Sequence, residues 1–202
     1  MKSSIKKRTF KAIYRLLDKV SPVNDDCGLL CGAACCTCES ERGVMEESGN
    51  NDCNADFSMG LYLLPGEEKL FSGDEDWLSW GWTMAEEYEF PESWHGKVFY
   101  LQCTSAPVCD RKKRPLQCRT FPLAPHLDEG GNLLLIYHSG YLPYECPLIT
   151  ERISLNPSFV RATYTAWSHL IEDPLIYDLI EMDSAYREED GEPIEVVYPK
   201  WD

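Results

Sequence analysis

Apolar residues recur at helical spacing near both ends of the chain. Within residues 1–20 they stand at positions i, i+3, i+4 and i+7, which predicts a basic amphipathic N-terminal helix with one buried stripe. Near the other end, an Asn-Pro pair and an Asp-Pro pair are each followed by apolar residues at helical spacing, which predicts a helical pair over about 156–188. We expect the carboxylates of that pair to be solvated or structural. The residues of the N-terminal stripe are Phe10, Ile13, Tyr14 and Leu17.

Between these ends the pattern changes to that of strands. Residues 98–103, with the sequence VFYLQC, are rich in aromatic and apolar side chains and predict one strand. Two apolar runs within residues 119–138 flank the turn-forming sequence DEGGN and predict a β-hairpin. The chain therefore predicts an α+β fold: a small, mostly antiparallel sheet made of this strand and hairpin, with covering helices and a cysteine-rich segment at its margin. We expect residues 21–202 to form one domain.

Charge is shared unevenly along the chain. The protein has 34 acidic and 19 basic side chains, a formal net charge of −15. Residues 1–20 hold seven of the basic and one of the acidic side chains, so the other 182 residues carry a net charge of −21. A body so acidic repels phosphate backbones, which argues against a nucleic-acid partner. We expect the basic first helix to pack on this acidic body.

The chain has no apolar run of the roughly 20 residues that a bilayer helix needs, so no membrane partner is expected. Charged residues at Arg15, Asp18 and Lys19 interrupt the apolar run that a signal peptide requires near its start. We therefore expect a cytoplasmic protein, in a compartment where thiols stay reduced and clustered cysteines more often bind metal than form disulfides.

The most unusual feature of the sequence is a cysteine cluster in residues 26–40, DCGLLCGAACCTCES, which holds five of the ten cysteines. Core packing does not explain this cluster, because an ordinary hydrophobic core is built from apolar residues spread over many helices and strands. Thiols so closely spaced are typical of a metal or iron–sulfur centre. The five residues are Cys27, Cys31, Cys35, Cys36 and Cys38.

Helix geometry limits how this cluster binds one ion. A straight helix with a rise of about 1.5 Å per residue would separate Cys27 from Cys38 by roughly 16 Å. Thiolates around one zinc, each about 2.3 Å from the metal, lie within roughly 4 Å of one another. Either the segment is a loop around the metal, eased by Gly28 and Gly32, or pairs of its thiols serve a centre completed by other cysteines.

A second cysteine block provides such partners about seventy residues later. Cys103, Cys109 and Cys118 frame the segment CTSAPVCDRKKRPLQC, whose basic run is the only strong one in the acidic body. Cations beside a thiolate centre offset its negative charge and lower thiol pKa values. A sharper hypothesis is that Arg111 and Arg114 bind an anionic cofactor or substrate beside the metal.

These two blocks together resemble the CxxCxxCC cysteine-cluster family, which is described as zinc- or iron-chelating. The resemblance covers about a fifth of the chain, and both gaps of the first block are three residues long where the family pattern has two. It implies a centre of zinc or iron, with an iron–sulfur cluster as one form. The matching residues are Cys27, Cys31, Cys35, Cys36, Cys103, Cys109 and Cys118, with Arg114, Pro115, Arg119, Phe121 and Pro122 around the last of them.

The first functional hypothesis is a metal-chelating protein whose partner is the metal ion itself. An alternative is an iron–sulfur-dependent enzyme that modifies protein side chains, because the flagellin lysine-N-methylase resembles this family in its cysteine cluster. A third is a thiol redox sensor. The sequence assigns no role to Cys38, Cys53 or Cys146, and leaves His126 and His138 as outside candidates for a Cys3His site.

Overall fold

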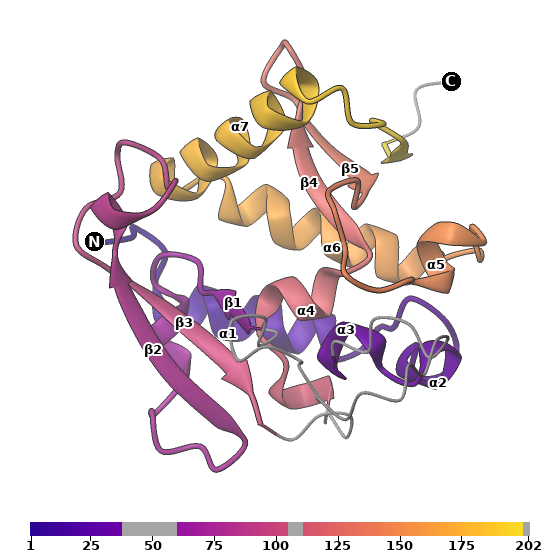
Figure 1. The fold of residues 1–202 in the computed structure, drawn as a ribbon, viewed down its shortest axis with the longest axis horizontal. Coiled ribbons are helices and arrows are strands. Elements are labelled where there is room, and N and C mark those ends of the chain that lie inside the picture. The colour runs from indigo at the N-terminus through magenta and orange to yellow at the C-terminus, as the bar shows by residue number, and fades with distance from the viewer. Residues whose placement is uncertain (38–59, 105–110, 200–202) are drawn as a thin grey trace, which may run out of the picture.

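The computed structural model describes residues 1–37, 60–104 and 111–199. Within these ranges the fold is α+β, as predicted, with two small antiparallel three-stranded sheets and several helices (Figure 1). The two sheets lie apart in the molecule and share no strand (Figure 1).

The first sheet has the strand order β1-β3-β2 and is antiparallel throughout. It consists of β1 (Gly60–Tyr62), β2 (Leu78–Met84) and β3 (Lys97–Cys103). The predicted strand VFYLQC is thus confirmed as the central strand of this sheet. Because Cys103 pairs with Leu78 at the last register position, its side chain is held at the end of the sheet.

The second sheet has the strand order β4-β5-β6 and is formed by β4 (Leu123–Leu127), β5 (Leu133–Tyr137) and β6 (Val196–Tyr198). The predicted hairpin is confirmed as β4 and β5. Its turn is stabilised by Asp128, whose Oδ1 accepts hydrogen bonds from the backbone N–H groups of Gly130 and Asn132 at 2.9 and 2.8 Å.

The expectation of one sheet made of the VFYLQC strand and the hairpin is wrong. Both pairing edges of β3 are taken by β1 and β2, and the free edge of β5 is taken by β6 from the end of the chain. A strand's own pattern predicts that it pairs but not with which partner, since that choice depends on contacts distant in sequence.

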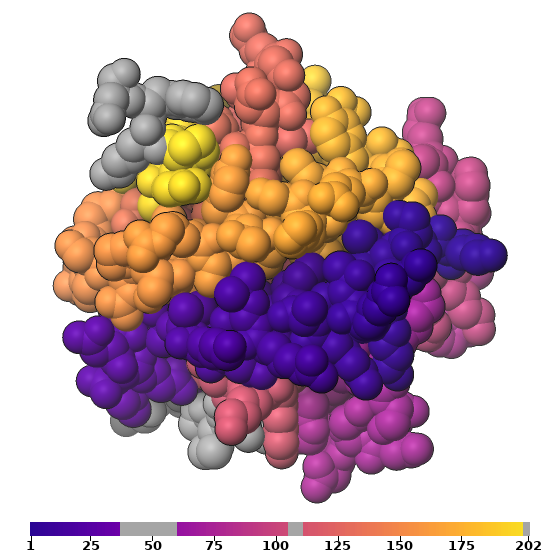
Figure 2. All heavy atoms as spheres, turned by 180° about the vertical axis from the view of Figure 1, so that it is seen from behind, coloured from indigo at the N-terminus to yellow at the C-terminus, as the bar shows by residue number. Residues whose placement is uncertain are grey.

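Three long helices cover the core: α1 (Lys7–Leu17), α6 (Pro157–Leu170) and α7 (Pro174–Glu189). All three lie where the apolar spacing predicts helices. On the rear face α1 lies along α6 (Figure 2), and α7 covers β4 (Figure 1). The basic first helix therefore packs on its own domain, as expected. Its buried residues are Phe10, Ile13 and Leu17.

None of the helices in the described ranges is long and apolar enough to cross a membrane.

Candidate metal centre

The first cysteine block folds as two single helical turns rather than one straight helix. They are α2 (Gly28–Cys31) and α3 (Ala34–Thr37). Gly32 and Ala33, with φ angles of 62° and 59°, interrupt the helix between them. Glycine adopts this left-handed conformation without steric cost, whereas alanine there is unusual. The first block is therefore not one straight helix, and both alternatives for how it binds an ion stay open.

The second block is placed by a strand end and a short helix. Cys103 ends β3, and Cys118 lies in the middle of α4 (Leu116–Thr120). Cys109, also predicted as a ligand, lies outside the described residues, as do Cys38 and Cys53.

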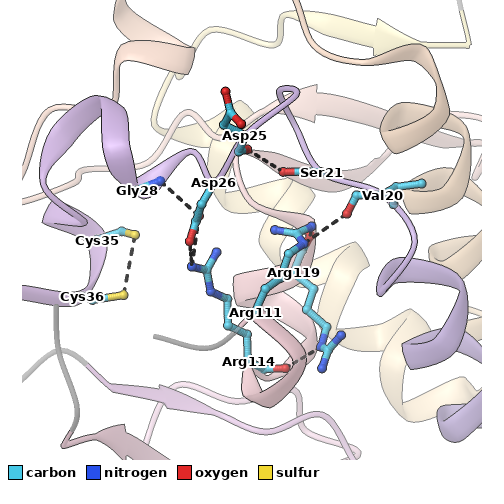
Figure 3. A network of polar contacts seen from close by, with 10 residues as sticks. All are labelled: Val20, Ser21, Asp25, Asp26, Gly28, Cys35, Cys36, Arg111, Arg114 and Arg119. Atoms are coloured by element: carbon cyan, nitrogen blue, oxygen red, sulfur yellow. Dashed lines mark hydrogen bonds and ion pairs between the residues drawn. The ribbon is translucent and has the colours of Figure 1, made fainter. Parts of the chain in front are cut away.

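A salt bridge joins the two blocks. One guanidinium nitrogen of Arg114 donates to both carboxylate oxygens of Asp26, at 3.2 and 3.1 Å, and Asp26 Oδ1 also accepts the backbone N–H of Gly28 (Figure 3). The Arg114 side chain is 11% exposed, so water screens this pair less than an open surface pair. Asp26 directly precedes Cys27, and Arg114 lies four residues before Cys118; the bridge thus fixes the two cysteine-bearing segments side by side.

Arg111 connects the second block to the segment between α1 and the first cysteine block. Its Nε donates to the carbonyl of Val20 at 3.1 Å, and one terminal nitrogen donates to the carbonyl of Arg119 at 3.3 Å (Figure 3). Both arginines predicted to bind an anion therefore have intramolecular partners. An anionic ligand for Arg111 and Arg114 stays a prediction. In the structure Arg114 joins the two cysteine blocks, and Arg111 joins the second block to Val20.

Five of the seven predicted cysteines line one cavity of about 380 Å³. Thiols of both blocks reach it, although about seventy residues separate the blocks in sequence. The predicted meeting of the two blocks is thus present in the structure. The five are Cys27, Cys35, Cys36, Cys103 and Cys118.

The thiols line one cavity, but they are not arranged around a single point. The Sγ atoms of Cys35 and Cys36 are 3.9 Å apart. Among the described residues, however, no three His, Cys, Asp or Glu side chains form a group arranged to hold one metal ion.

The structure adds two residues that sequence reasoning did not assign to the site, Tyr144 and Cys146. Burial raises the pKa of the Tyr144 hydroxyl, and the thiols of Cys35 and Cys146 raise it further. Cys146 is 7% exposed; burial raises its pKa, and the thiols of Cys31 and Cys27 add to this. Its only sequence signal is the Cys-Pro dipeptide, which by itself is weak.

In the first block the Cys27 thiol is the one whose ionisation the structure opposes. Burial raises the pKa of Cys27, while the guanidinium of Arg114 acts in the opposite direction. A soft divalent ion would replace that proton, because metals bind the thiolate and release the proton. The donor chemistry therefore suits zinc or iron.

The two histidines named as outside candidates lie apart from each other. His138 lines the cavity, whereas His126 lies under α7 with Nε2 3.6 Å from Glu188 Oε1. Comparison with protein-family models, characterised proteins and solved structures finds no match for this chain.

Proposed function

We propose that the protein binds a zinc or iron centre, either an ion or an iron–sulfur cluster, through cysteine thiolates of the two blocks. The observation that supports this proposal best is the shared cavity, which is lined by Cys27 at the start of α2 and by cysteines of α3, β3 and α4. Thiols of both blocks are thus available to one ion or cluster.

The donor set we propose has seven members. It exceeds the four thiolates of one zinc site, so either two ions share a bridging sulfur or an iron–sulfur cluster uses part of the set. Cys146 is an eighth candidate because its buried thiol lies near Cys27 and Cys31. The seven donors are Cys27, Cys31, Cys35, Cys36, Cys103, Cys109 and Cys118.

Part of the proposed donor set already has the spacing of a metal site. Thiolates on one zinc lie within roughly 4 Å of one another, a distance that Cys35 and Cys36 already meet. Cys27, Cys103 and Cys118 line the same cavity, and rotation about χ1 moves a cysteine sulfur between staggered positions while the backbone stays in place. The salt bridge between Asp26 and Arg114 joins the two segments.

Charge supports the same assignment. Four thiolates on one Zn²⁺ leave a net charge of about −2, in a body that is already acidic. Arg114 and Arg111 lie beside Cys27 and act on its thiol electrostatically. Their positive charge would offset part of the centre's negative charge without either residue being a ligand.

The test is elemental analysis of protein purified without oxygen or added metals, with an absorption spectrum of the same sample. We expect zinc at one or two equivalents in a colourless protein, or iron with acid-labile sulfide and a brown colour. The double variant Cys27→Ser, Cys118→Ser removes one donor from each block and should lose most of the metal.

The matched control is Cys53→Ser, which removes a thiol that the sequence does not place in either block and should keep the wild-type metal content. Wild-type protein that contains no metal, and that takes up neither Zn²⁺ in a chelator competition nor iron and sulfide under anaerobic reconstitution, would refute the proposal. Equal metal loss in the control and the double variant would refute the donor assignment.

A further inference from the structure

One side of α1 is strongly basic and faces solvent. At about 100° per residue, the four basic positions of this helix fall within one arc of about 100°. The arc lies away from the buried stripe of Phe10, Ile13 and Leu17, and all four side chains are exposed. On the rear of the molecule α1 runs across the surface beside α6 (Figure 2). The four residues, which we call the basic face, are Lys7, Arg8, Lys11 and Arg15.

The acidic side chains of the domain do not pair with the basic face. None of its four side chains forms a salt bridge or a hydrogen bond with any residue in the ranges that the structure describes. The single acidic residue within residues 1–20, Asp18, is paired with Arg119 instead. The neighbouring helix α6 has no acidic residue in its sequence PSFVRATYTAWSHL. The face therefore keeps its positive charge, although the protein as a whole carries a net charge of −15.

This placement of charge opposes the stability of α1 itself. Lys11 has a like charge four residues away on each side, at Lys7 and Arg15, and like charges at this spacing destabilise a helix. Lys7 and Arg8 lie in the first turn, where the helix dipole disfavours cations, and that turn has neither an acidic residue nor a side-chain cap. Only Arg15, in the last turn, is favoured by the dipole. Helix stability gives no reason for this arrangement, which is a mark of a functional surface.

We propose that the basic face binds an acidic segment of another protein, whose Asp and Glu side chains lie along α1. The face extends from Lys7 to Arg15, which is about 12 Å along the helix axis. A short acidic segment matches that length, whereas a nucleic-acid duplex or a membrane surface extends far beyond it. Such larger polyanions would also meet the rest of the chain, whose net charge of −21 repels them.

The packing of α1 separates this surface from a membrane-binding helix. An amphipathic helix binds a membrane by burying its apolar face among the lipids. In α1 that face already packs in the core, where Phe10 and Leu17 are 0% exposed. The basic face therefore recognises its partner by charge, and such binding weakens as salt screens the interaction. The proposal does not rest on the metal centre.

The experiment compares two fluorescently labelled peptides, eight glutamates and eight glutamines, by fluorescence anisotropy with the full chain at pH 7. We expect the glutamate peptide to bind at least about tenfold more tightly than the glutamine peptide at about 50 mM salt, and to lose about tenfold in affinity at about 300 mM. Equal affinity of the two peptides, or no binding of the glutamate peptide at low salt, would overturn the proposal.

Two variants locate the binding. Lys7→Gln with Lys11→Gln removes two charges of the basic face and should weaken glutamate-peptide binding at least about fivefold. The matched control, Lys97→Gln with Lys113→Gln, removes the same charge from exposed positions outside α1 and should bind as the wild type does. Equal weakening in both variants would overturn the assignment to α1.

Stability provides a second measurement on the same variant. Because Lys7→Gln with Lys11→Gln removes two like-charge pairs, we expect it to unfold at no lower urea concentration than the wild type. A clear loss of stability would show that the two lysines have stabilising partners within the chain, and would overturn the argument.

Further probes test the other classes of partner. A DNA duplex of about 20 base pairs and vesicles that contain phosphatidylserine are measured under the same conditions. Tighter binding of either one than of the glutamate peptide would overturn the assignment to an acidic protein segment. Sedimentation of the full chain at low salt tests self-association. A dimer that Lys7→Gln with Lys11→Gln abolishes would assign the face to contacts between two copies of this chain, and would overturn a separate partner.

Discussion

Arg119 offers the sharpest test of how the cysteine segments are held, because it is a fully buried charge with several partners. It is 0% exposed and lies directly after Cys118. Its Nε donates to the carbonyl of Arg114 at 2.5 Å, and its terminal nitrogens donate to the carbonyl of Lys112 and to the carboxylate of Asp18. The guanidinium carbon also lies 4.2 Å from the centre of the Tyr14 ring. One side chain thus ties α1 to the segment that leads into α4.

Replacing Arg119 by methionine keeps much of the side-chain volume and removes every one of these donors. Each hydrogen bond to a charged group contributes about 1.5–3 kcal/mol, and the carbonyls and carboxylate left behind lose their partner. Breaking a buried ion pair typically costs about 3–5 kcal/mol. We therefore expect Arg119→Met to lower the free energy of unfolding by about 3–5 kcal/mol, a large part of the 5–15 kcal/mol typical of a domain.

Urea unfolding followed by circular dichroism and tryptophan fluorescence measures this change. Arg119→Lys keeps the charge but not the planar fork of donors, so its loss should be intermediate. The matched control is Arg161→Met on the exposed face of α6, which should change stability by no more than about 0.5 kcal/mol. A loss below about 1 kcal/mol in Arg119→Met, at an unchanged urea dependence, would refute the reasoning.

Further predictions concern pH, the buried core and metal removal. Burial raises the pKa of Asp173, but hydrogen bonds from Ser4, Ser3 and the start of α7 outweigh burial and lower this pKa below 3.8. The stability that the Asp173 carboxylate adds is present above pH 3.8 and is lost as the pH falls through the lowered pKa. Asp173→Asn should remove this acid-dependent part, measured as thermal stability between pH 6 and pH 3, and an unchanged profile would contradict it. Tyr14→Phe removes a donor to the buried Glu67 carboxylate and should cost about 1–3 kcal/mol in urea unfolding. Chelator treatment should lower the melting temperature; metal at 100 times its Kd contributes about 2.7 kcal/mol, and an identical melting curve would contradict metal binding.

The helices, their first residues and the hairpin turn could be predicted from the sequence alone. The stripe of Phe10, Ile13 and Leu17 defines one face of a helix within eight residues, and it forms that face in the structure. The starts of α6 and α7 and the turn around Asp128 depend on residues adjacent in sequence. Periodicity, caps and turns are determined over a few residues, so no tertiary contact is needed to recognise them.

The candidate metal centre could be predicted from the sequence only in part. The sequence predicts that the two cysteine blocks meet, because neither block by itself supplies all the ligands of a metal centre. The salt bridge between Asp26 and Arg114 joins the two blocks across 88 positions of sequence. The sequence showed the basic run but not its bonding, because the partners of a guanidinium are chosen by the fold.

Tertiary structure alone decided three further points. It placed β3 and the β4–β5 hairpin in separate sheets, because the strands that fill their edges come from distant segments. It brought Cys146 beside the first cysteine block. It also placed Asp183 and Arg187 of α7 in the lining of the cavity that the cysteines share. The sequence determines the chemical type of each side chain. Its solvent access and its neighbours depend on how the chain packs, and they decide which interactions the side chain makes.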